Sequence, residues 1–217
     1  MRRTTKNLVL SMILGVSVVF LAYCVVPPFS DLQSAKLVGK GRIELTPGFS
    51  SVSVTAEGES QHVQNNFGIQ AGYGVSKSLD FRLRYERLQL DTGEDESYGL
   101  NVLGFGPKFS VVKDWVAIFL PVGFAFGSDV EVSKTWQFQP TLLFTVPFNK
   151  NIELNTSAKG LIWFQSGYDS LVAFNLGFGL SSDLDKWAIR PEIGFLIDPG
   201  EKGHYMHLSI GFSYRFK

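Results

Sequence analysis

The stretch His207–Lys217, with the sequence HLSIGFSYRFK, decides the fold. Side chains alternate along a β-strand, so its large apolar residues share one face, while small, polar and charged residues share the other. The apolar residues are Leu208, Ile210, Phe212, Tyr214 and Phe216. The strand is therefore amphipathic, and the rest of the chain must show whether its apolar face meets a protein core or lipid.

The composition suits one large all-β domain. The chain has 217 residues, including 19 Phe and 22 Gly, a pairing typical of strands with one wide face and one crowded face. Lys and Arg together number 20, as do Asp and Glu. This balance gives no indication of a nucleic-acid partner, and none is expected.

The N-terminus has the features of a targeting segment. A basic start, Met1–Lys6, precedes an uncharged apolar run from Leu8 to Ala22, which predicts a signal peptide over residues 1–24. Leu21-Ala22-Tyr23-Cys24 resembles a bacterial lipoprotein signal, and the resemblance implies lipidation of Cys24. Plain signal cleavage and a retained membrane helix are the alternatives. As the only cysteine, Cys24 indicates no disulfide.

The remaining chain divides into a short non-periodic part and a long periodic part. Residues 25–40, with Pro27-Pro28, lack periodicity and are expected to form a periplasmic tether. Residues 41–217 contain alternating runs of about ten residues, the pattern typical of a transmembrane β-barrel. Ten antiparallel strands are predicted in an up-and-down barrel, at 41–55, 63–75, 80–90, 98–111, 116–127, 136–147, 152–163, 171–181, 187–196 and 205–216. Strand 98–111 supports two registers, which predicts a bulge.

The connections between these runs alternate in length. Short turns are expected at 76–79, 112–115, 148–151 and 182–186, and longer polar loops at 56–62, 91–97, 127–134, 164–170 and 197–204. Short periplasmic turns opposite longer external loops are usual in outer-membrane barrels, and both termini would lie on the turn side. The tryptophans fall at strand ends: Trp115 and Trp187 beside short turns, Trp136 and Trp163 beside long loops. Two such aromatic girdles indicate a lipid-exposed band, so the apolar face of 208–216 should touch lipid.

The opposite faces of the strands carry charges of both signs. Such faces cannot meet lipid and suit a polar barrel interior, where they would pair across a narrow bore. The predicted lumen charge network comprises Arg42, Glu44, Asp80, Arg82, Arg84, Glu86, Lys108, Glu153, Lys159, Arg190, Glu192 and Arg215.

Residues 41–217 as a whole resemble the small outer-membrane β-barrel proteins of Gram-negative bacteria. The resemblance is architectural and implies an outer-membrane location, with lipid and lipopolysaccharide as surroundings. The terminal aromatic strand also resembles the signal that the barrel assembly machinery recognises, although Lys217 follows Phe216.

Two groups of residues raise the question of chemistry. His207-Leu208-Ser209 resembles the His-x-Ser of outer-membrane phospholipases and lipid A deacylases, in which the histidine activates the serine. Parity turns this pair inward, which favours interior packing. His62, His204 and His207, with Glu57, Glu59 or Glu201, could form a metal site or an omptin-like protease centre, although solvated loop histidines are favoured. No catalytic residue, metal or cofactor is assigned.

The sequence leaves three functions open. The favoured one is a non-enzymatic scaffold or surface protein with a lumen plugged by charges and with acidic external loops. A narrow small-solute channel is the second, and a membrane-embedded hydrolase the third. The loop acids are Glu57, Glu59, Asp91, Glu94, Asp95, Glu96, Asp129, Glu131, Asp169, Asp198 and Glu201, against only Lys134 and Lys202. No external ligand can be named from these residues.

Overall fold

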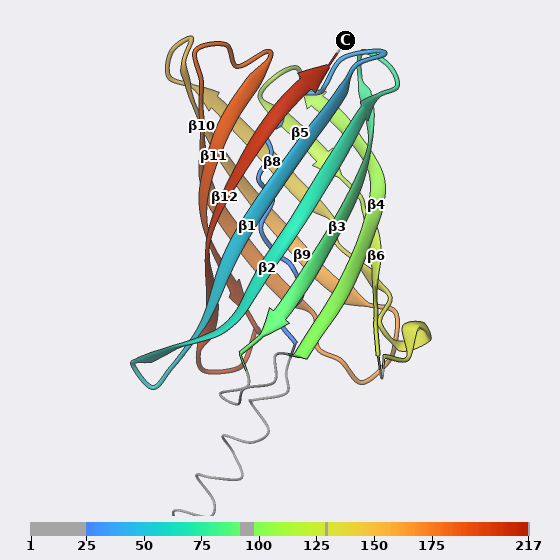
Figure 1. Cartoon of the computed structure of the whole chain (residues 1–217), viewed down its shortest axis with the longest axis vertical. Coiled ribbons are helices and arrows are strands. Elements are labelled where there is room, and N and C mark those ends of the chain that lie inside the picture. The colour runs from blue at the N-terminus through green and yellow to red at the C-terminus, as the bar shows by residue number, and fades with distance from the viewer. Residues whose placement is uncertain (1–24, 92–97, 129, 217) are drawn as a thin grey trace, which may run out of the picture.

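A computed structural model describes residues 25–91, 98–128 and 130–216. Their strands form one closed antiparallel sheet of ten strands, which confirms the predicted fold class (Figure 1). The elements are β1 (Ile43–Ala56), β2 (Glu59–Gly74), β3 (Leu79–Leu90), β4 (Tyr98–Val112), β5 (Val116–Phe119), β6 (Val122–Phe126), η1 (Val132–Lys134), β7 (Gln137–Phe138), β8 (Thr141–Pro147), β9 (Ile152–Trp163), β10 (Leu171–Leu180), β11 (Trp187–Ile197) and β12 (His204–Phe216). Within these ranges, no helix is long and apolar enough to cross a membrane.

Two of the ten strands are interrupted at prolines. β5 and β6 are parts of one strand separated at Leu120-Pro121, and β7 and β8 are parts of the next, separated at Gln139-Pro140. Proline has no N–H to donate to a ladder, so regular pairing stops at these positions. The barrel stays closed because the two parts of each strand still pair with the same neighbours.

The outside of the barrel is apolar and the inside is polar. Leu208, Ile210 and Phe212 of β12 are about half exposed, whereas the alternate residues Ser209 and Ser213 are buried. Exposed large apolar side chains recur on the other strands, including Phe81 and Leu83 of β3. An exterior of this kind must be covered by hydrocarbon, so the apolar face of the last strand is a lipid face.

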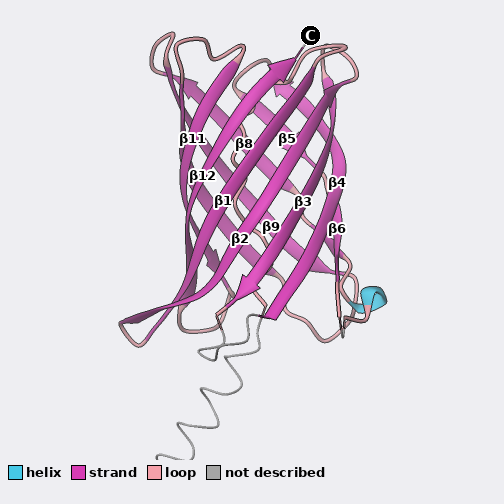
Figure 2. Ribbon diagram, viewed as in Figure 1, coloured by secondary structure: helices cyan, strands magenta, loops and turns pink. Residues whose placement is uncertain are grey.

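The two ends of the barrel differ. Figure 2 shows the strand connections gathered at its two ends, and Figure 1 shows the C-terminus beside the β2–β3 connection at one of them. We call this the turn end; it also holds the connections β4–β5, β8–β9 and β10–β11. The opposite end, which carries the longer loops and η1, is the loop end. This asymmetry matches the expected topology.

One local prediction was wrong, and another holds at a different position within its strand. The loop expected at 56–62 is a two-residue turn, Glu57-Gly58, with φ of 53° and 87°. Positive φ at both central residues gives a tight hairpin whose twist suits its strands, so β1 and β2 run on to Ala56 and Glu59. The bulge expected in strand 98–111 corresponds to an irregularity in the β4–β5 pairing between Ser110 and Val112, at the end of the strand, whereas residues 98–109 pair with β3 without interruption.

The N-terminal part of the described chain lies inside the barrel. Residues 26–35 and Val38 are buried, and Figure 1 shows this blue segment behind the front strands. The expectation of a periplasmic tether over 25–40 is therefore not met. We call Val26–Val38 the lumen segment. It has no helix or strand, so wall side chains must satisfy its backbone groups.

Candidate functional site

The lumen segment runs the full length of the barrel. At the loop end, the Val26 N–H donates to Gln64 Oε1 at 3.2 Å, and Gln64 Nε2 donates to the Val26 carbonyl at 3.0 Å. At the turn end, the Val38 N–H donates to Asp80 Oδ2 at 2.7 Å, just before the chain enters β1. Thirteen residues can span roughly 40 Å when extended, more than the roughly 25 Å of an apolar band.

An apolar collar surrounds the segment at the loop end. Val26 and Phe29 pack in one buried cluster with inward side chains of β1, β9, β10 and β11, namely Val52, Leu161, Ala173 and Leu196. The Phe29 ring also meets the His207 ring edge-on, with centroids 4.6 Å apart. Apolar side chains that face a lumen are removed from water only if an apolar group fills the lumen beside them. Val26 and Phe29 supply that group.

A buried polar cage holds the centre of the segment at Asp31. Its carboxylate lies 2.8 Å from Lys159 Nζ and accepts hydrogen bonds from Asn175 Nδ2, at 2.8 Å, and from the Ser157 hydroxyl. The Glu192 carboxylate accepts the backbone N–H groups of Asp31 and Leu32 at 2.7 and 2.9 Å. Each carboxylate thus has charged or amide donors, as buried charges require.

Lys108 of β4 binds the segment further toward the turn end. Its fully buried ammonium group donates to the carbonyl of Ser34 at 2.5 Å, the carbonyl of Lys36 at 3.1 Å and Gln33 Oε1 at 3.3 Å. An ammonium has three donors, and all three point to the lumen segment. Lys108 therefore binds the lumen segment, mainly through its backbone carbonyls, instead of pairing with a carboxylate across an open lumen.

Two neighbouring residues, Ala35 and Lys36, fix the segment near the turn end. The Ala35 N–H donates to Thr145 Oγ1 at 2.7 Å, and the Ala35 methyl group packs with Ala117 and Leu143. Lys36 Nζ lies 2.8 Å from Glu153 Oε2. The segment is thus held by side chains along its whole path.

Paired glycines in the wall leave room for the segment. Gly48 of β1 lies opposite Gly211 of β12, and a Cβ on Gly48 would lie 2.6 Å from the Leu32 Cδ1 atom. A Cβ on Gly211 would lie 3.3 Å from the same atom. Glycine is thus needed here for the close approach of Leu32.

All the predicted lumen charges except Arg42 pair within the wall, bind the lumen segment, or do both. The wall pairs are Glu44 with Arg215 at 2.7 Å and with Arg82 at 3.0 Å, Glu153 with Arg190 at 3.2 Å, and Glu86 with Arg84. The lumen segment is bound by Asp80, Lys108, Lys159 and Glu192. It is also bound by two residues of the wall pairs, Arg84 through the Ser30 carbonyl and Glu153 through Lys36. Arg42 stands apart at the turn end, where it donates to the Asp185 carbonyl at 2.9 Å.

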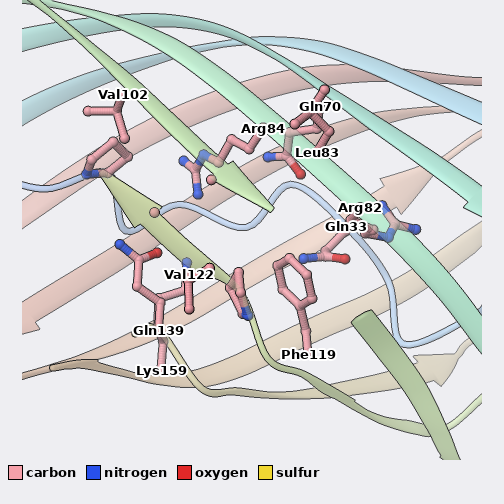
Figure 3. Close-up of a pocket in the computed structure, with 14 residues that line it drawn as sticks. Gln33, Gln70, Arg82, Leu83, Arg84, Val102, Phe119, Val122, Gln139 and Lys159 are labelled. Carbon is pink, nitrogen blue, oxygen red and sulfur yellow. The ribbon is translucent and has the colours of Figure 1, made fainter. Parts of the chain in front are cut away.

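The space left beside the segment is small. A cavity of about 30 Å³ lies between the segment and the interrupted strands β5 and β6, lined in part by Gln33, Arg82, Arg84, Phe119 and Gln139 (Figure 3). Figure 3 shows the blue ribbon of the segment passing through this region. A cavity of that volume holds one or two water molecules.

The histidines lie apart in different surroundings. His207 is buried, with Nδ1 2.6 Å from Ser209 Oγ and Nε2 3.0 Å from Asn175 Oδ1, and the Phe29 ring covers it. Ser209 Oγ donates to Ser50 Oγ at 2.6 Å. His62 contacts Ser51 at 3.3 Å, and the His204 ring lies by Phe195. Among the described residues, no three His, Cys, Asp or Glu side chains are grouped to hold a metal.

The remaining predicted features concern the rims. Trp115, Trp136, Trp163 and Trp187 lie at or beside strand ends, two near each end of the barrel. In the β6–β7 loop, the hydrogen bond from Lys134 lowers the pKa of the exposed Glu131 carboxyl. Cys24, the signal peptide and the acids at 94–96 and 129 lie outside the described residues.

The residues of the lumen segment, such as Asp31, were not predicted from the sequence as part of the site. Neither were the uncharged wall residues that bind the segment, among them Gln64, Thr145 and Asn175. Two signals were present. Inward positions near the loop end carry apolar residues, such as Leu161 and Leu196, and inward positions of β1 and β12 carry Gly48 and Gly211. Both are unsuited to an open polar lumen and indicate that something fills it.

The fold and this lipid-facing exterior define an outer-membrane β-barrel protein, and the outer membrane is the location that goes with it. No family model and no curated protein matches the chain. Among solved structures, it is similar to Ail of Yersinia pestis, at 11% identity over 82% of this chain and 99% of that one, with a TM-score of 0.40. It is also similar to the translocator domain of the autotransporter NalP of Neisseria meningitidis (13%, 82% and 89%, 0.42) and to OprG of Pseudomonas aeruginosa (12%, 85% and 99%, 0.33). These likenesses concern the course of the backbone alone.

Proposed function

We propose that this protein is a non-conducting, non-enzymatic barrel that serves as a membrane scaffold. Its lumen is closed by its own lumen segment together with the wall charges, and its exposed acidic loops form the outer surface. Lipid and lipopolysaccharide would surround the barrel, and the barrel assembly machinery would insert it.

One observation carries the proposal: the lumen segment is bound by buried side chains along its whole path. The ligands come from β2, β3, β4, β8, β9, β10 and β11. Releasing the segment would break its bonds to Lys159, Lys108 and Glu192 and would expose the apolar collar to water. A segment bound in this way is expected to stay in the interior, and the cavity of about 30 Å³ beside it has room only for water.

The hydrolase alternative is disfavoured by access. His207 and Ser209 are buried on the face opposite the lipid, and the Phe29 ring covers His207, so an acyl-ester substrate in the membrane could not reach Ser209. The short distance between Ser209 Oγ and His207 Nδ1 is explained by interior hydrogen bonding that also includes Ser50.

Planar-bilayer recording of the purified full-length chain tests the proposal. We expect no stable unitary conductance from the natural protein. A variant with Phe29→Gly, Asp31→Gly and Gln33→Gly should conduct, because it loses the ring, the cage anion and one Lys108 acceptor. Phe212→Ala, on the lipid face, is the matched control and should remain silent. Reproducible conductance steps from the natural protein would overturn the closed-lumen proposal in favour of a channel.

A further inference from the structure

We infer that the barrel carries its own N-terminus to the external face, so that the mature N-terminus is displayed outside the membrane instead of in the periplasm. The inference concerns the direction of the lumen segment and holds whether or not the barrel conducts.

The direction follows from contacts at the two ends of the segment. Val26 bonds to Gln64, and Gln64 pairs with Leu90, the last residue of β3, at the loop end. Val38 bonds to Asp80, the second residue of β3, at the turn end. The segment therefore runs antiparallel to β3, with its N-terminal side toward the long loops.

Intermediate contacts give the same order. Phe29 packs with Leu161 and Leu196 near the loop ends of β9 and β11, Asp31 lies at the level of Ser157, and Lys36 reaches Glu153 near the start of β9. The segment thus descends β9 steadily from Leu161 to Glu153 as its residue numbers rise. A chain that looped back to the turn end could not make this series of contacts.

The turn end also has a fixed exit toward β1. The Gly41 N–H donates to the Gly74 carbonyl at 2.7 Å, the Gly74 N–H donates to the Arg42 carbonyl at 3.0 Å, and Gly39 and Gly41 both have positive φ. A Cβ on Gly74 would fall 1.8 Å from the Gly39 carbonyl oxygen, so the chain turns here in close contact with the wall. The C-terminal side of the segment is joined to β1 at the turn end, so its N-terminal side faces the loop end.

The direction of the segment also determines on which side of the membrane the N-terminus would lie after lipidation of Cys24 or plain signal cleavage. A lipid anchor beginning just before Val25 would start at the external mouth of the barrel, on the side of the outer leaflet. With short turns in the periplasm, an acyl group at the inner leaflet would require the segment to leave the lumen. The same reasoning applies to a free α-amino group after plain cleavage.

Surface labelling of the full-length chain tests the inference. A short epitope is inserted between Cys24 and Val25, and two matched chains carry it at Glu57-Gly58, in a loop-end turn, or at Asn149-Lys150, in a turn-end connection. Antibody should bind intact cells for the first two and only permeabilised cells for the third. Retention of the folded, heat-modifiable band on gels selects the correctly inserted chains.

A second variant avoids the insertion. Cys24→Ser with Val25→Cys leaves one thiol, which a membrane-impermeant maleimide should modify on intact cells as well as it modifies a chain with Cys24→Ser and Gly58→Cys, within about twofold. Labelling of the N-terminal site only after permeabilisation, by either method, overturns the inference. So does a reversed result in the two control sites, because the barrel would then be inserted the other way.

Discussion

The Asp31 carboxylate lies 2.8 Å from the Lys159 ammonium group in the middle of the lumen, and the two side chains expose only 3% and 2% of their surface. One comes from the non-periodic N-terminal segment and the other from β9. The pair therefore joins the part of the chain with no regular structure to the wall of the barrel, and Ser157, Asn175 and Glu192 bind the segment beside it.

Removing one partner of this pair should destabilise the barrel. Asp31→Asn keeps the shape but removes the negative charge beside Lys159, which then has neutral acceptors there, among them the carbonyl oxygens of Phe29 and Ser30, both at 3.2 Å. Breaking a buried pair costs about 3–5 kcal/mol, so we expect a loss near the lower limit. The measurement is urea unfolding of the protein in lipid vesicles. Adding Lys159→Met should recover part of the loss, and an Asp31→Asn chain as stable as the natural one would contradict the assignment.

The glycine pair beneath Leu32 gives a prediction about packing. Gly48→Ala places a methyl group 2.6 Å from Leu32 Cδ1 and should cost about 1–3 kcal/mol through overpacking. The loss of unfolding free energy in the double variant Gly48→Ala, Leu32→Ala should be smaller than the sum of the two single losses, because the smaller side chain at position 32 removes the clash.

Gly104→Ala is the matched control for Gly48→Ala, since a Cβ there meets only the Val122 carbonyl oxygen at 3.8 Å. Its unfolding free energy should differ little from that of the natural chain. Equal losses for Gly48→Ala and Gly104→Ala would mean that Leu32 does not lie over β1.

On the lipid face of β12, the free-energy cost of introducing a charge should depend on its depth in the bilayer. Ile210 lies at the middle of the strand and Phe216 at its end, and both are exposed on the exterior. Ile210→Arg should cost about 2–4 kcal/mol in vesicles, and Phe216→Arg about 0–1, because the charge is costly only near the bilayer midplane. Similar costs at the two positions would argue against a membrane band centred on Ile210.

Most of the barrel could be predicted from the sequence because each strand has one lipid face and one lumen face. That alternation is a local property, so Phe81 and Arg82 already indicate opposite sides from their neighbours alone. Ten runs and the tryptophans at their ends then define a closed membrane barrel. The Glu57-Gly58 turn was missed because a positive φ at Glu57 is not favoured by its residue type.

The lumen segment could not be predicted in the same way. Periodicity arises when an element has one buried side and one exposed side, whereas Val26–Val38 is surrounded on all sides. Its backbone is satisfied by residues distant in sequence, such as Glu192 and Thr145, so no local pattern marks it. The wall charges were expected to pair across an empty bore, but Lys108 and Lys159 are placed to bind chain that the sequence pattern had assigned elsewhere.

Amide hydrogen exchange along Val26–Val38, followed by NMR in micelles, shows most directly whether this segment lies inside the lumen. The N–H groups of Asp31, Leu32, Ala35 and Val38 donate to buried side chains. We predict that they exchange as slowly as strand amides of β9 and β12, and far more slowly than Lys202 and Gly203 in an external loop. Exchange of these four amides at the rate of the loop residues would contradict a segment held inside the lumen.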